Sequence, residues 1–272
     1  MTTETSTPAA EHQRWREARH SAVTGPHGNL ALVGFLQVTE QPEQLDQIPA
    51  TVWRVGDADE IMVTADAADE VRLDGELVDG DRAWARLRPD GTPLLTWQGL
   101  AADAFSLDGS AFEVRVYDPS APRRVEFERI DCYDYDPQLV VPARFVRDAE
   151  VQAVPWEFSR GSDSGSLKQV PGSVQFTLGG EEHRLAGFLD GRVLVVVFAD
   201  ETTGRESYAP GRFLKLDIPQ DGELELDLNR AFVPPCGFSD FYSCPLPPAG
   251  NRLSVPVRGG ERRVIWREQQ QA

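Results

Sequence analysis

The chain has 272 residues, of which 40% are hydrophobic and 26% are charged, a composition typical of a globular protein with one or two domains. Its formal net charge is −17, because 44 acidic residues outnumber 27 lysines and arginines. Such a chain lacks the basic surface that binds nucleic acid or an anionic membrane, so we expect neither partner.

The N-terminal segment and the cysteines indicate a compartment. Residues 1–13 contain neither the basic region nor the apolar run of a secretory signal, and no apolar run approaches the length of a membrane span. Three cysteines, an odd number, argue against a framework of disulfides. These observations predict a cytoplasmic protein and leave its oligomeric state open.

The chain is predicted to begin with a disordered tail over residues 1–7, followed by one helix. Thr7 suits the helix cap and Pro8 the first helical position, and the apolar spacing runs to about His20. A short apolar stripe around Trp15 favours docking of this helix on a sheet.

From Thr51 onward the sequence is a succession of short strands separated by turn signals. Four Asp-Gly pairs are typical of hairpin turns, because glycine readily adopts positive φ: Asp74-Gly75, Asp79-Gly80, Asp90-Gly91 and Asp108-Gly109. Many short strands at this spacing indicate a β-sandwich or barrel. We therefore predict an all-β, mainly antiparallel fold with an N-terminal helix.

The strands are expected to form two subdomains. The first covers residues 8–145, and the second covers 146–267, with residues 125–154 as the connection between them. The stretch V-W-R-V-G-D-A-D-E-I-M-V at 52–63 resembles the start of a forkhead-associated-type sandwich. Asp57 stands where those domains need an arginine to hold phosphothreonine, so the resemblance concerns the fold and does not predict phosphopeptide binding.

Residues 227–252, here called the signature loop, concentrate the chemically special residues. This loop contains two cysteines, two Asn-Arg pairs, five prolines and four aromatic rings. The alternation of Leu224, Leu226 and Leu228 with polar residues predicts a strand before the loop, and Pro234-Pro235 must end it. The aromatic rings favour folding of the loop over the end of the sheet.

Two arginines share the core-facing parity of the neighbouring leucines. Arg230 is in phase with Leu224 to Leu228, and Arg212 is in phase with Leu214. Inward-facing arginines need partners, because an unpaired buried charge costs several kcal/mol. The candidate partners are Asp200, Asp217, Asp227 and Asp240. Val193 to Phe198, an apolar strand expected to be buried on both faces, leads into Asp200.

The sequence G-R-F-L at 211–214, followed by L-D-L-N-R-A-F-V-P-P-C-G-F-S-D-F-Y-S-C-P-L-P-P-A-G-N-R-L at 226–253, resembles the C-terminal signature of the DUF1684 family of bacterial and archaeal proteins. The family signature reads roughly G-R-F, then D-F-N-R-A-Y-N-P-P-C-A, then C-P-L-P-P-x-N-R-L and A-G-E-K. Val233 stands where the family has asparagine, which removes a polar group from any shared site. The family has no established activity, so the resemblance implies no mechanism.

Other catalytic and metal motifs are weak. Cys236 and Cys244 are eight residues apart with no histidine nearby, so we expect buried thiols and no zinc site. The aspartates in Tyr133–Pro137 lack the spacing of a calcium loop. Ser239 lacks the setting of a nucleophile elbow, and His183 is expected to be exposed, which disfavours a Cys-His pair.

The main functional hypothesis is the binding of a small anionic molecule by the signature loop and its neighbours, since guanidinium groups grip carboxylates and phosphates. The candidate ligand-binding residues are Tyr208, Arg212, Asp227, Asn229, Arg230, Asn251 and Arg252. Alternatively, the same residues pin the loop to the sheet. A hydrolase using Asp200, Asp227 or a cysteine, and a structural or interaction module, are the other hypotheses. The sequence indicates no particular cofactor.

Overall fold

The structure is a computed structural model that describes residues 7–44, 47–56, 60–86, 94–105, 112–159, 167–218 and 222–267. The chain forms two compact units, residues 22–125 and residues 1–21 with 126–272, which we call unit 2 and unit 1. The described fold is mainly antiparallel β-sheet with one long N-terminal helix, as the sequence predicts.

The elements of unit 2 are η1 (Asn29–Ala31), β1 (Leu32–Val38), β2 (Glu43–Gln44), β3 (Thr51–Arg54), β4 (Glu60–Ala65), η2 (Ala67–Asp69), β5 (Arg72–Leu73), β6 (Glu76–Leu77), β7 (Gly80–Arg86), β8 (Leu95–Trp97), β9 (Leu100–Phe105) and β10 (Phe112–Tyr117). The short helix α2 (Pro122–Glu126) ends the unit.

The elements of unit 1 are α1 (Pro8–Thr24), which continues into unit 2, and β11 (Phe127–Cys132), η3 (Pro137–Leu139), β12 (Val140–Pro155), β13 (Leu167–Leu178), β14 (Glu181–Asp190), β15 (Val193–Phe198), β16 (Arg212–Asp217), β17 (Glu223–Asp227), η5 (Leu228–Arg230), η6 (Pro235–Gly237), η7 (Ala249–Asn251) and β18 (Glu261–Trp266).

Unit 2 is a sandwich of two antiparallel sheets, with strand orders β1-β10-β9-β8-β5-β6 and β2-β3-β4-β7. Both sheets contribute to one core, in which Val63 and Trp84 from one sheet join Leu95 and Val114 from the other. This shared apolar layer accounts for the many short alternating strands in the sequence. The likeness to forkhead-associated domains stays a prediction.

The Asp-Gly pairs of unit 2 have different roles. Asp74-Gly75 is a hairpin turn between β5 and β6, with φ values of 48° and 83°. Asp79-Gly80, predicted to be a hairpin turn, instead connects β6 with β7 of the other sheet, so it turns a corner between the sheets. Gln98-Gly99 forms the β8–β9 turn, which the sequence analysis missed. Asp90-Gly91 and Asp108-Gly109 lie outside the described residues.

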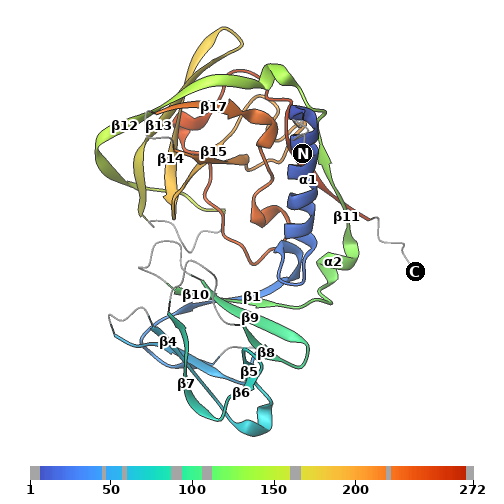
Figure 1. The fold of residues 1–272 in the computed structure, drawn as a ribbon, viewed down its shortest axis with the longest axis vertical. Helices are drawn as coiled ribbons and strands as arrows, with labels where there is room; N and C mark the ends of the chain where they lie inside the picture. The colour runs from blue at the N-terminus through green and yellow to red at the C-terminus, as the bar shows by residue number, and fades with distance from the viewer. Residues whose placement is uncertain are drawn as a thin grey trace, which may run out of the picture. The chain divides into compact units, whose positions relative to one another are not determined.

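Unit 1 is built on a six-stranded sheet with the order β16-β15-β14-β13-β12-β17. Its long strands bend strongly and form a half-barrel (Figure 1). Along β15, Leu194 and Val196 belong to one core cluster, whereas Val195 and Val197 belong to a second cluster. The strand is therefore buried on both faces, as its continuous apolar sequence predicts.

The edge strands of this sheet, β16 and β17, are consecutive in the chain. Residues 218–222 connect them, yet β16 pairs only with β15 and β17 only with β12. Within the described parts of the chain, the two strands do not pair with each other. An opening therefore separates the two edges of the half-barrel.

The segment predicted to connect two subdomains belongs to unit 1. Here β11 pairs with β18, and β12 pairs with β13 and β17. The boundary between the units therefore lies near residue 125, earlier than the expected 145, and the helix lies mainly in unit 1 and not with the N-terminal sandwich. These pairings join residues far apart in the sequence, so local patterns do not reveal them.

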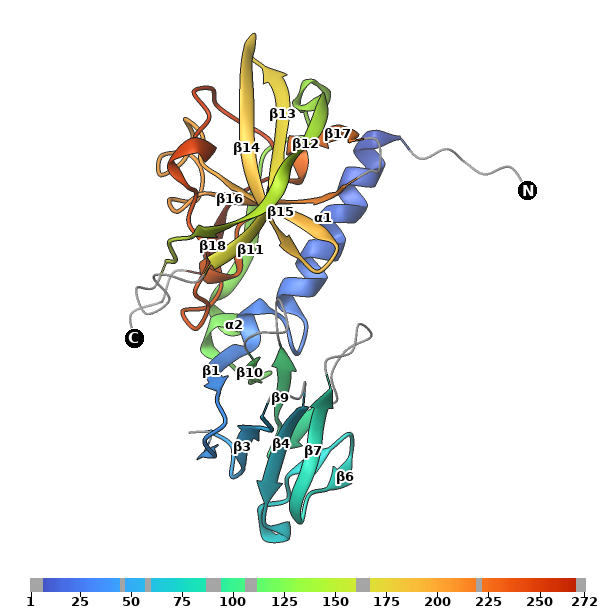
Figure 2. The ribbon, with the colours of Figure 1, turned by 90° about the vertical axis from the view of Figure 1, so that its left-hand side faces the viewer.

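Helix α1 begins at Pro8, and the Thr7 hydroxyl accepts a hydrogen bond from the Ala10 amide at 3.3 Å, which confirms the predicted cap. It ends at Thr24, one turn beyond the predicted end, because the first helix-breaking pair is Gly25-Pro26. Figures 1 and 2 show α1 alongside the sheet of unit 1.

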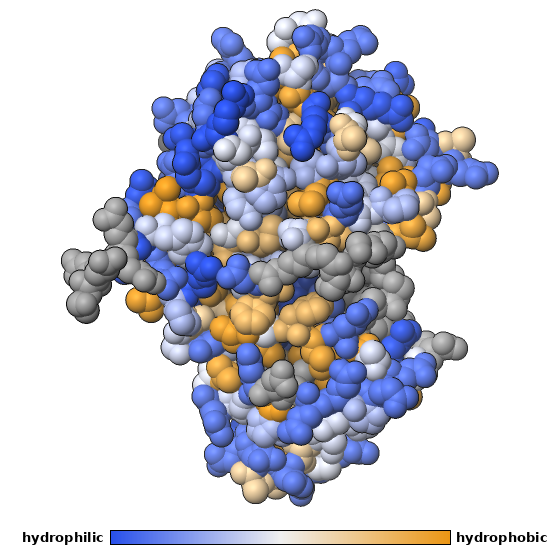
Figure 3. All heavy atoms as spheres, turned by 180° about the vertical axis from the view of Figure 1, so that it is seen from behind, coloured by the Kyte–Doolittle hydropathy of each residue, from blue (hydrophilic) through white to orange (hydrophobic). Residues whose placement is uncertain are grey.

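Among the described residues, the helices are all too short or too polar to cross a membrane. On the face seen in Figure 3, hydrophilic side chains are spread over each unit.

Candidate functional site

Arg212 is fully buried at the start of β16, and both of its terminal Nη nitrogens are bonded by the protein, whereas its Nε has no hydrogen-bond partner among the described residues. Its Nη2 donates to Asp200 Oδ2 at 2.8 Å, and both side chains are completely inaccessible. The same nitrogen donates to the Val257 carbonyl at 2.7 Å, and Nη1 donates to the carbonyls of Gly259 at 2.6 Å and Glu261 at 3.2 Å. The parity argument for this arginine is confirmed, with Asp200 as its partner. The guanidinium crosslinks β16 to the chain between the signature loop and β18.

Asn229 is fully buried and joins the signature loop to the chain just before η3. Its Oδ1 accepts from the Asp136 amide at 2.9 Å, and its Nδ2 donates to the Asp136 carbonyl at 2.9 Å. Nδ2 also donates to Asp227 Oδ1 at 2.9 Å. The side-chain amide thus imitates a backbone pairing between two loops.

Asn251 makes a similar connection at the end of the β14–β15 ladder, where its side chain is 1% exposed. Its Oδ1 accepts from the Ala186 amide at 2.9 Å, and its Nδ2 donates to the carbonyls of Ala186 at 2.8 Å and Val197 at 2.7 Å. The last regular pair of this ladder is Gly187 with Val196, so Asn251 satisfies the backbone where the two strands separate.

These bonds occupy the side-chain amides of Asn229 and Asn251 and both Nη nitrogens of Arg212, and the remaining Arg212 Nε belongs to a side chain that is completely inaccessible. The geometry therefore favours the alternative that these three residues pin the loop to the sheet. Two of the loop's aromatic rings are buried with them, Phe232 and Phe238, whereas Phe241 is 46% exposed.

Arg230 lies at the surface, although its parity predicts a core-facing side chain. The strand β17 ends at Asp227, and residues 228–230 form the 3-10 turn η5, in which the period of two no longer applies. The Arg230 side chain is 48% exposed, and its Nε lies 3.3 Å from Asp227 Oδ2. Among the described residues, its terminal Nη groups form no hydrogen bond.

Arg230 and Asp227 line a groove of about 590 Å³ between the two edges of the half-barrel. The other walls come from the start of α1, the chain before β12, and the strands β16 and β17. The lining residues are Pro8, Glu11, Tyr135, Pro137, Val140, Leu214, Lys215, Leu216, Asp217, Leu224, Glu225, Asp227 and Arg230. We call this the edge groove. Its charged side chains comprise four carboxylates and two cations.

His12 of α1 is buried beside the edge groove, with only 4% of its surface exposed. Its ring stacks on Trp15 at 5.4 Å between centroids and contacts the Tyr135 ring, also at 5.4 Å. Neither ring nitrogen has a hydrogen-bond partner among the described residues. A buried imidazole with both nitrogens unpartnered is unusual, because such groups normally find a protein, water or ligand partner.

The surrounding charges act on His12 in opposite directions. Burial lowers its pKa most strongly, because the charged form loses hydration, and the Asp227 carboxylate raises it. The cations of Arg16 and Arg230 lower the pKa further. His12 is therefore held as a neutral imidazole, which can both donate and accept a hydrogen bond.

The remaining ligand-site candidates, Tyr208 and Arg252, lie elsewhere. The Tyr208 hydroxyl donates to Cys236 Sγ at 3.6 Å, beside the thiol of Cys244. Arg252 is exposed, and only its backbone bridges to Ala199. The structure therefore separates the predicted residues into a buried anchor, the edge groove, a thiol cluster and an exposed arginine.

The carboxylates proposed for hydrolysis are engaged by the protein. Asp200 accepts from Arg212 and from the Thr202 amide at 2.7 Å. Asp227 caps η5 by accepting from the Asn229 amide at 3.0 Å. Ser239 is buried, and its hydroxyl accepts from the Phe241 amide at 3.3 Å, as expected for a turn serine.

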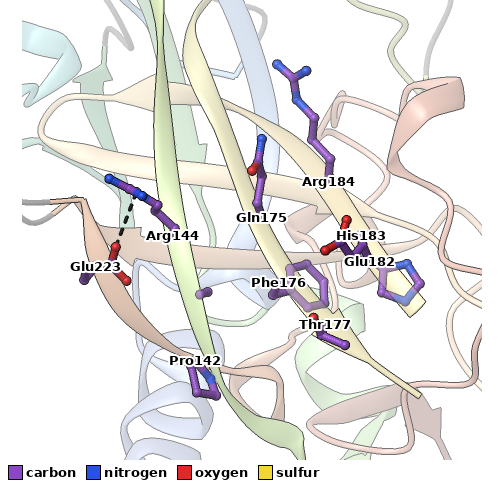
Figure 4. Close-up of a pocket in the computed structure, with 10 residues that line it drawn as sticks. Pro142, Arg144, Gln175, Phe176, Thr177, Glu182, His183, Arg184 and Glu223 are labelled. Atoms are coloured by element: carbon purple, nitrogen blue, oxygen red, sulfur yellow. Dashed lines mark ion pairs between the residues drawn. The ribbon is translucent and has the colours of Figure 1, made fainter. Parts of the chain in front are cut away.

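A second hollow of about 530 Å³ lies over β12, β13, β14 and β17 (Figure 4). Arg144 and Glu223 point toward one another there and form an exposed ion pair at 3.3 Å. The His183 Nε2 in this hollow lies 3.1 Å from the Leu178 carbonyl oxygen, and its ring packs on Phe176. No cysteine is close to His183 in the sequence. We give this hollow no functional role.

The described residues contain no group of three or more His, Cys, Asp or Glu side chains close enough to hold a metal ion. Within the segment Tyr133–Pro137, the Asp136 side chain caps η3 by accepting from the Gln138 amide at 2.9 Å.

Sequence reasoning missed Tyr135 and Lys215 as lining residues of the edge groove and His12 as a residue buried beside it. Each lies in a different segment, so no motif or spacing relates them. The polar residue His12 on the sheet-facing side of α1, next to Trp15, was the one available signal.

Comparison with known proteins identifies one family. A family model described as "Protein of unknown function (DUF1684)" matches residues 125–262, which fall almost entirely in unit 1. A solution NMR structure of an uncharacterized protein of Haloarcula marismortui is 34% identical, covers 53% of this chain and 82% of its own, and superposes with a TM-score of 0.44. The search of curated proteins found no match.

Proposed function

We propose that this chain, which belongs to the DUF1684 family of proteins of unknown function, binds a small molecule in the edge groove. The observation that carries the proposal is the position of Arg230, whose half-exposed guanidinium faces a groove of about 590 Å³ next to the unpartnered imidazole of His12. Both side chains offer directed hydrogen bonds that the described part of the protein does not use.

Arg230 supports a ligand with an anionic group. Its Nε is directed to Asp227, which orients the guanidinium and leaves the terminal Nη donors for a carboxylate or a single phosphate. Lys215, the other cation of the groove, is already paired with Asp190 at 3.2 Å. Arg230 is therefore the principal anion contact.

The carboxylates of the groove limit the charge of the ligand. Glu11, Asp217, Glu225 and Asp227 outnumber the cations, so a polyphosphate or a dicarboxylate would meet repulsion. A molecule with one anionic group and additional amino or hydroxyl groups fits this pattern, because the carboxylates accept its hydrogen bonds. An amino acid or a hydroxy acid has this chemistry.

We further propose that the protein is cytoplasmic and that its partner is a small molecule. A cytoplasmic location suits the three cysteines, which are all thiols. The net charge of −17 supports a small molecule as the partner over nucleic acid or an anionic membrane.

Thermal unfolding of the full chain tests the proposal against free amino acids, hydroxy acids and nucleoside triphosphates. A ligand at 100 times its Kd stabilises the folded protein by about 2.7 kcal/mol. Arg230→Gln is expected to weaken binding by about 10-fold or more, because a hydrogen bond to a charged group contributes about 1.5–3 kcal/mol. The variant itself should remain as stable as wild type, because exposed ion pairs contribute little.

Arg252→Gln is the matched control, because it removes an exposed arginine that also follows an asparagine in the signature loop but lies outside the groove. It should retain the full ligand response. Equal responses of wild type and Arg230→Gln, equal losses in both variants, or no response of wild type to amino or hydroxy acids would contradict the proposal.

A further inference from the structure

The signature loop brings two cysteine sulfurs together, although eight positions separate them in the sequence. The backbone amide of Cys236 donates to Cys244 Sγ at 3.2 Å. Cys244 is fixed in turn by Ser159, because its amide donates to Ser159 Oγ at 3.0 Å and its carbonyl accepts from the Ser159 amide at 2.8 Å. Both cysteines are thiols.

Tyr208 holds the first of these thiols from the other side. Its hydroxyl donates to Cys236 Sγ at 3.6 Å, and its own amide donates to the Arg262 carbonyl at 2.7 Å. The loop approaches the tyrosine ring at Gly237, where a Cβ atom would lie 3.3 Å from Tyr208 Cε2 and only 2.4 Å from Val233 Cγ1. Glycine at this position therefore permits the close packing that aligns the hydroxyl with the sulfur.

The two sulfurs differ in access. Cys236 is partly exposed, whereas Cys244 is 5% exposed and belongs to the apolar cluster around Trp156 and Phe188. An external reagent therefore meets Cys236 first, and Cys244 lies behind it.

Hydrogen bonds lower the pKa of the Cys236 thiol. The bond from the Cys244 thiol lowers its pKa most, burial opposes this, and further bonds from Tyr208 and Ser159 bring the pKa to about 7. Burial raises the pKa of Tyr208 and the Cys236 charge raises it further, so the tyrosine stays protonated as the donor. Asp240 adds a smaller upward effect on that tyrosine.

Cys132 on β11 provides an internal contrast. Burial is the main cause that raises its pKa, which is about 11. This thiol is half-buried; the Glu261 and Asp131 carboxylates raise its pKa further, and Arg16 lowers it.

We propose that Cys236 and Cys244 form a reactive dithiol that reduces small disulfides, with Cys236 as the attacking thiolate and Cys244 as the resolving thiol. This activity is independent of the edge groove, because none of the residues lining that groove belongs to the thiol cluster.

The reaction has two balanced steps. Cys236 Sγ⁻ attacks one sulfur of a small disulfide RSSR, which forms a mixed disulfide Cys236–S–SR and releases RS⁻. Cys244 then loses its proton to solvent, and its thiolate attacks Cys236 Sγ, which forms the Cys236–Cys244 disulfide and releases the second RS⁻. The protein is oxidised by two electrons and the external disulfide is reduced to two thiols.

The probe for this reaction is 5,5′-dithiobis(2-nitrobenzoate), added in small excess to the full native chain, with release of thionitrobenzoate followed by absorbance. Wild type should release two equivalents in the fast phase and retain no aryl adduct. At pH 7 the combination of thiolate fraction and intrinsic nucleophilicity makes Cys236 faster than Cys132 by a factor on the order of 50. The fast phase should have its half-maximal rate near pH 7.

Variants assign the roles. Cys236→Ser should lose the fast phase, and Cys244→Ser should release one equivalent quickly and keep a stable mixed disulfide that mass spectrometry detects. Tyr208→Phe should move the half-maximal rate to higher pH, because it removes one donor to the thiolate. Cys132→Ser, the control, should behave as wild type.

Identification of the modified cysteines in wild type tests the proposal even if a variant fails to fold. Mass spectrometry of briefly treated wild type should find the Cys236–Cys244 disulfide. Equal modification of Cys236 and Cys132, or a persistent aryl adduct on wild-type Cys236, would overturn the proposal.

Discussion

Removal of the buried Arg212 guanidinium should destabilise unit 1 more than removal of any exposed charge. Arg212→Met keeps most of the apolar stem but deletes the group that bonds Asp200 and three carbonyls. The Asp200 carboxylate would remain in a site where its side chain is completely inaccessible.

The magnitude follows from this geometry. Breaking a buried ion pair by removing one partner costs about 3–5 kcal/mol, because the remaining charge is uncompensated. Asp200 still accepts from the amides of Thr202 at 2.7 Å and Val257 at 3.3 Å, which keeps the cost within that range. A loss of about 4 kcal/mol in a domain of this size lowers Tm by about 8–16 °C.

Urea and thermal unfolding of the full chain measure this loss, and hydrogen exchange of the β15 and β16 peptides assigns it to unit 1. Arg252→Met, which removes an exposed arginine, is the control and should shift Tm by no more than about 2 °C. The double variant Asp200→Asn with Arg212→Met should recover about 2 kcal/mol, because it removes the unpaired charge. If Arg212→Met melted with wild type, the guanidinium would not hold the loop and the reasoning would be refuted.

Three further changes test other contacts of unit 1. His12→Phe should be at least as stable as wild type at pH 7, because it removes unpartnered buried nitrogens. As the pH falls below about 6.5, wild type should lose stability relative to this variant, because His12 binds a proton in the unfolded state that the folded state disfavours. Parallel pH profiles of the two proteins in urea titrations would contradict this. Asn251→Ala should cost about 2–4 kcal/mol in the same titrations, because three buried backbone bonds lose their partner; a cost below 1 kcal/mol would show that they contribute little. Gly260→Ala should cost more than about 2 kcal/mol of stability, because Gly260 has a φ of 75° and an added Cβ would lie 2.2 Å from the Ala231 carbonyl oxygen. Gly250→Ala, where the added Cβ meets open space, is the control. Equal Tm values for the two variants would show that Gly260 is not needed for its backbone conformation.

Several features of this protein could be predicted from local sequence. The alternation of apolar residues and the Asp-Gly pairs predict an antiparallel β fold, because strand periodicity and turn geometry depend on neighbouring residues. The cap at Thr7 and the doubly buried strand β15 follow for the same reason. The signature loop identified the family, since its motif is continuous in the chain.

The tertiary structure decided what each residue of that loop does. Arg212 and Arg230 have the same parity, yet one is buried and the other is half-exposed, because the strand ends before Arg230. Whether a polar side chain is available to a ligand depends on partners that are distant in sequence, such as the Val257 and Gly259 carbonyls for Arg212 and the Asp136 backbone for Asn229.

The same reason applies to both proposed sites. The edge groove exists because the two edge strands of one sheet stay unpaired, and the dithiol exists because the loop folds back on Ser159 and Tyr208. Local sequence determines secondary structure through short-range sterics and periodicity. The juxtaposition of His12 with Arg230 instead depends on which distant surfaces bury one another.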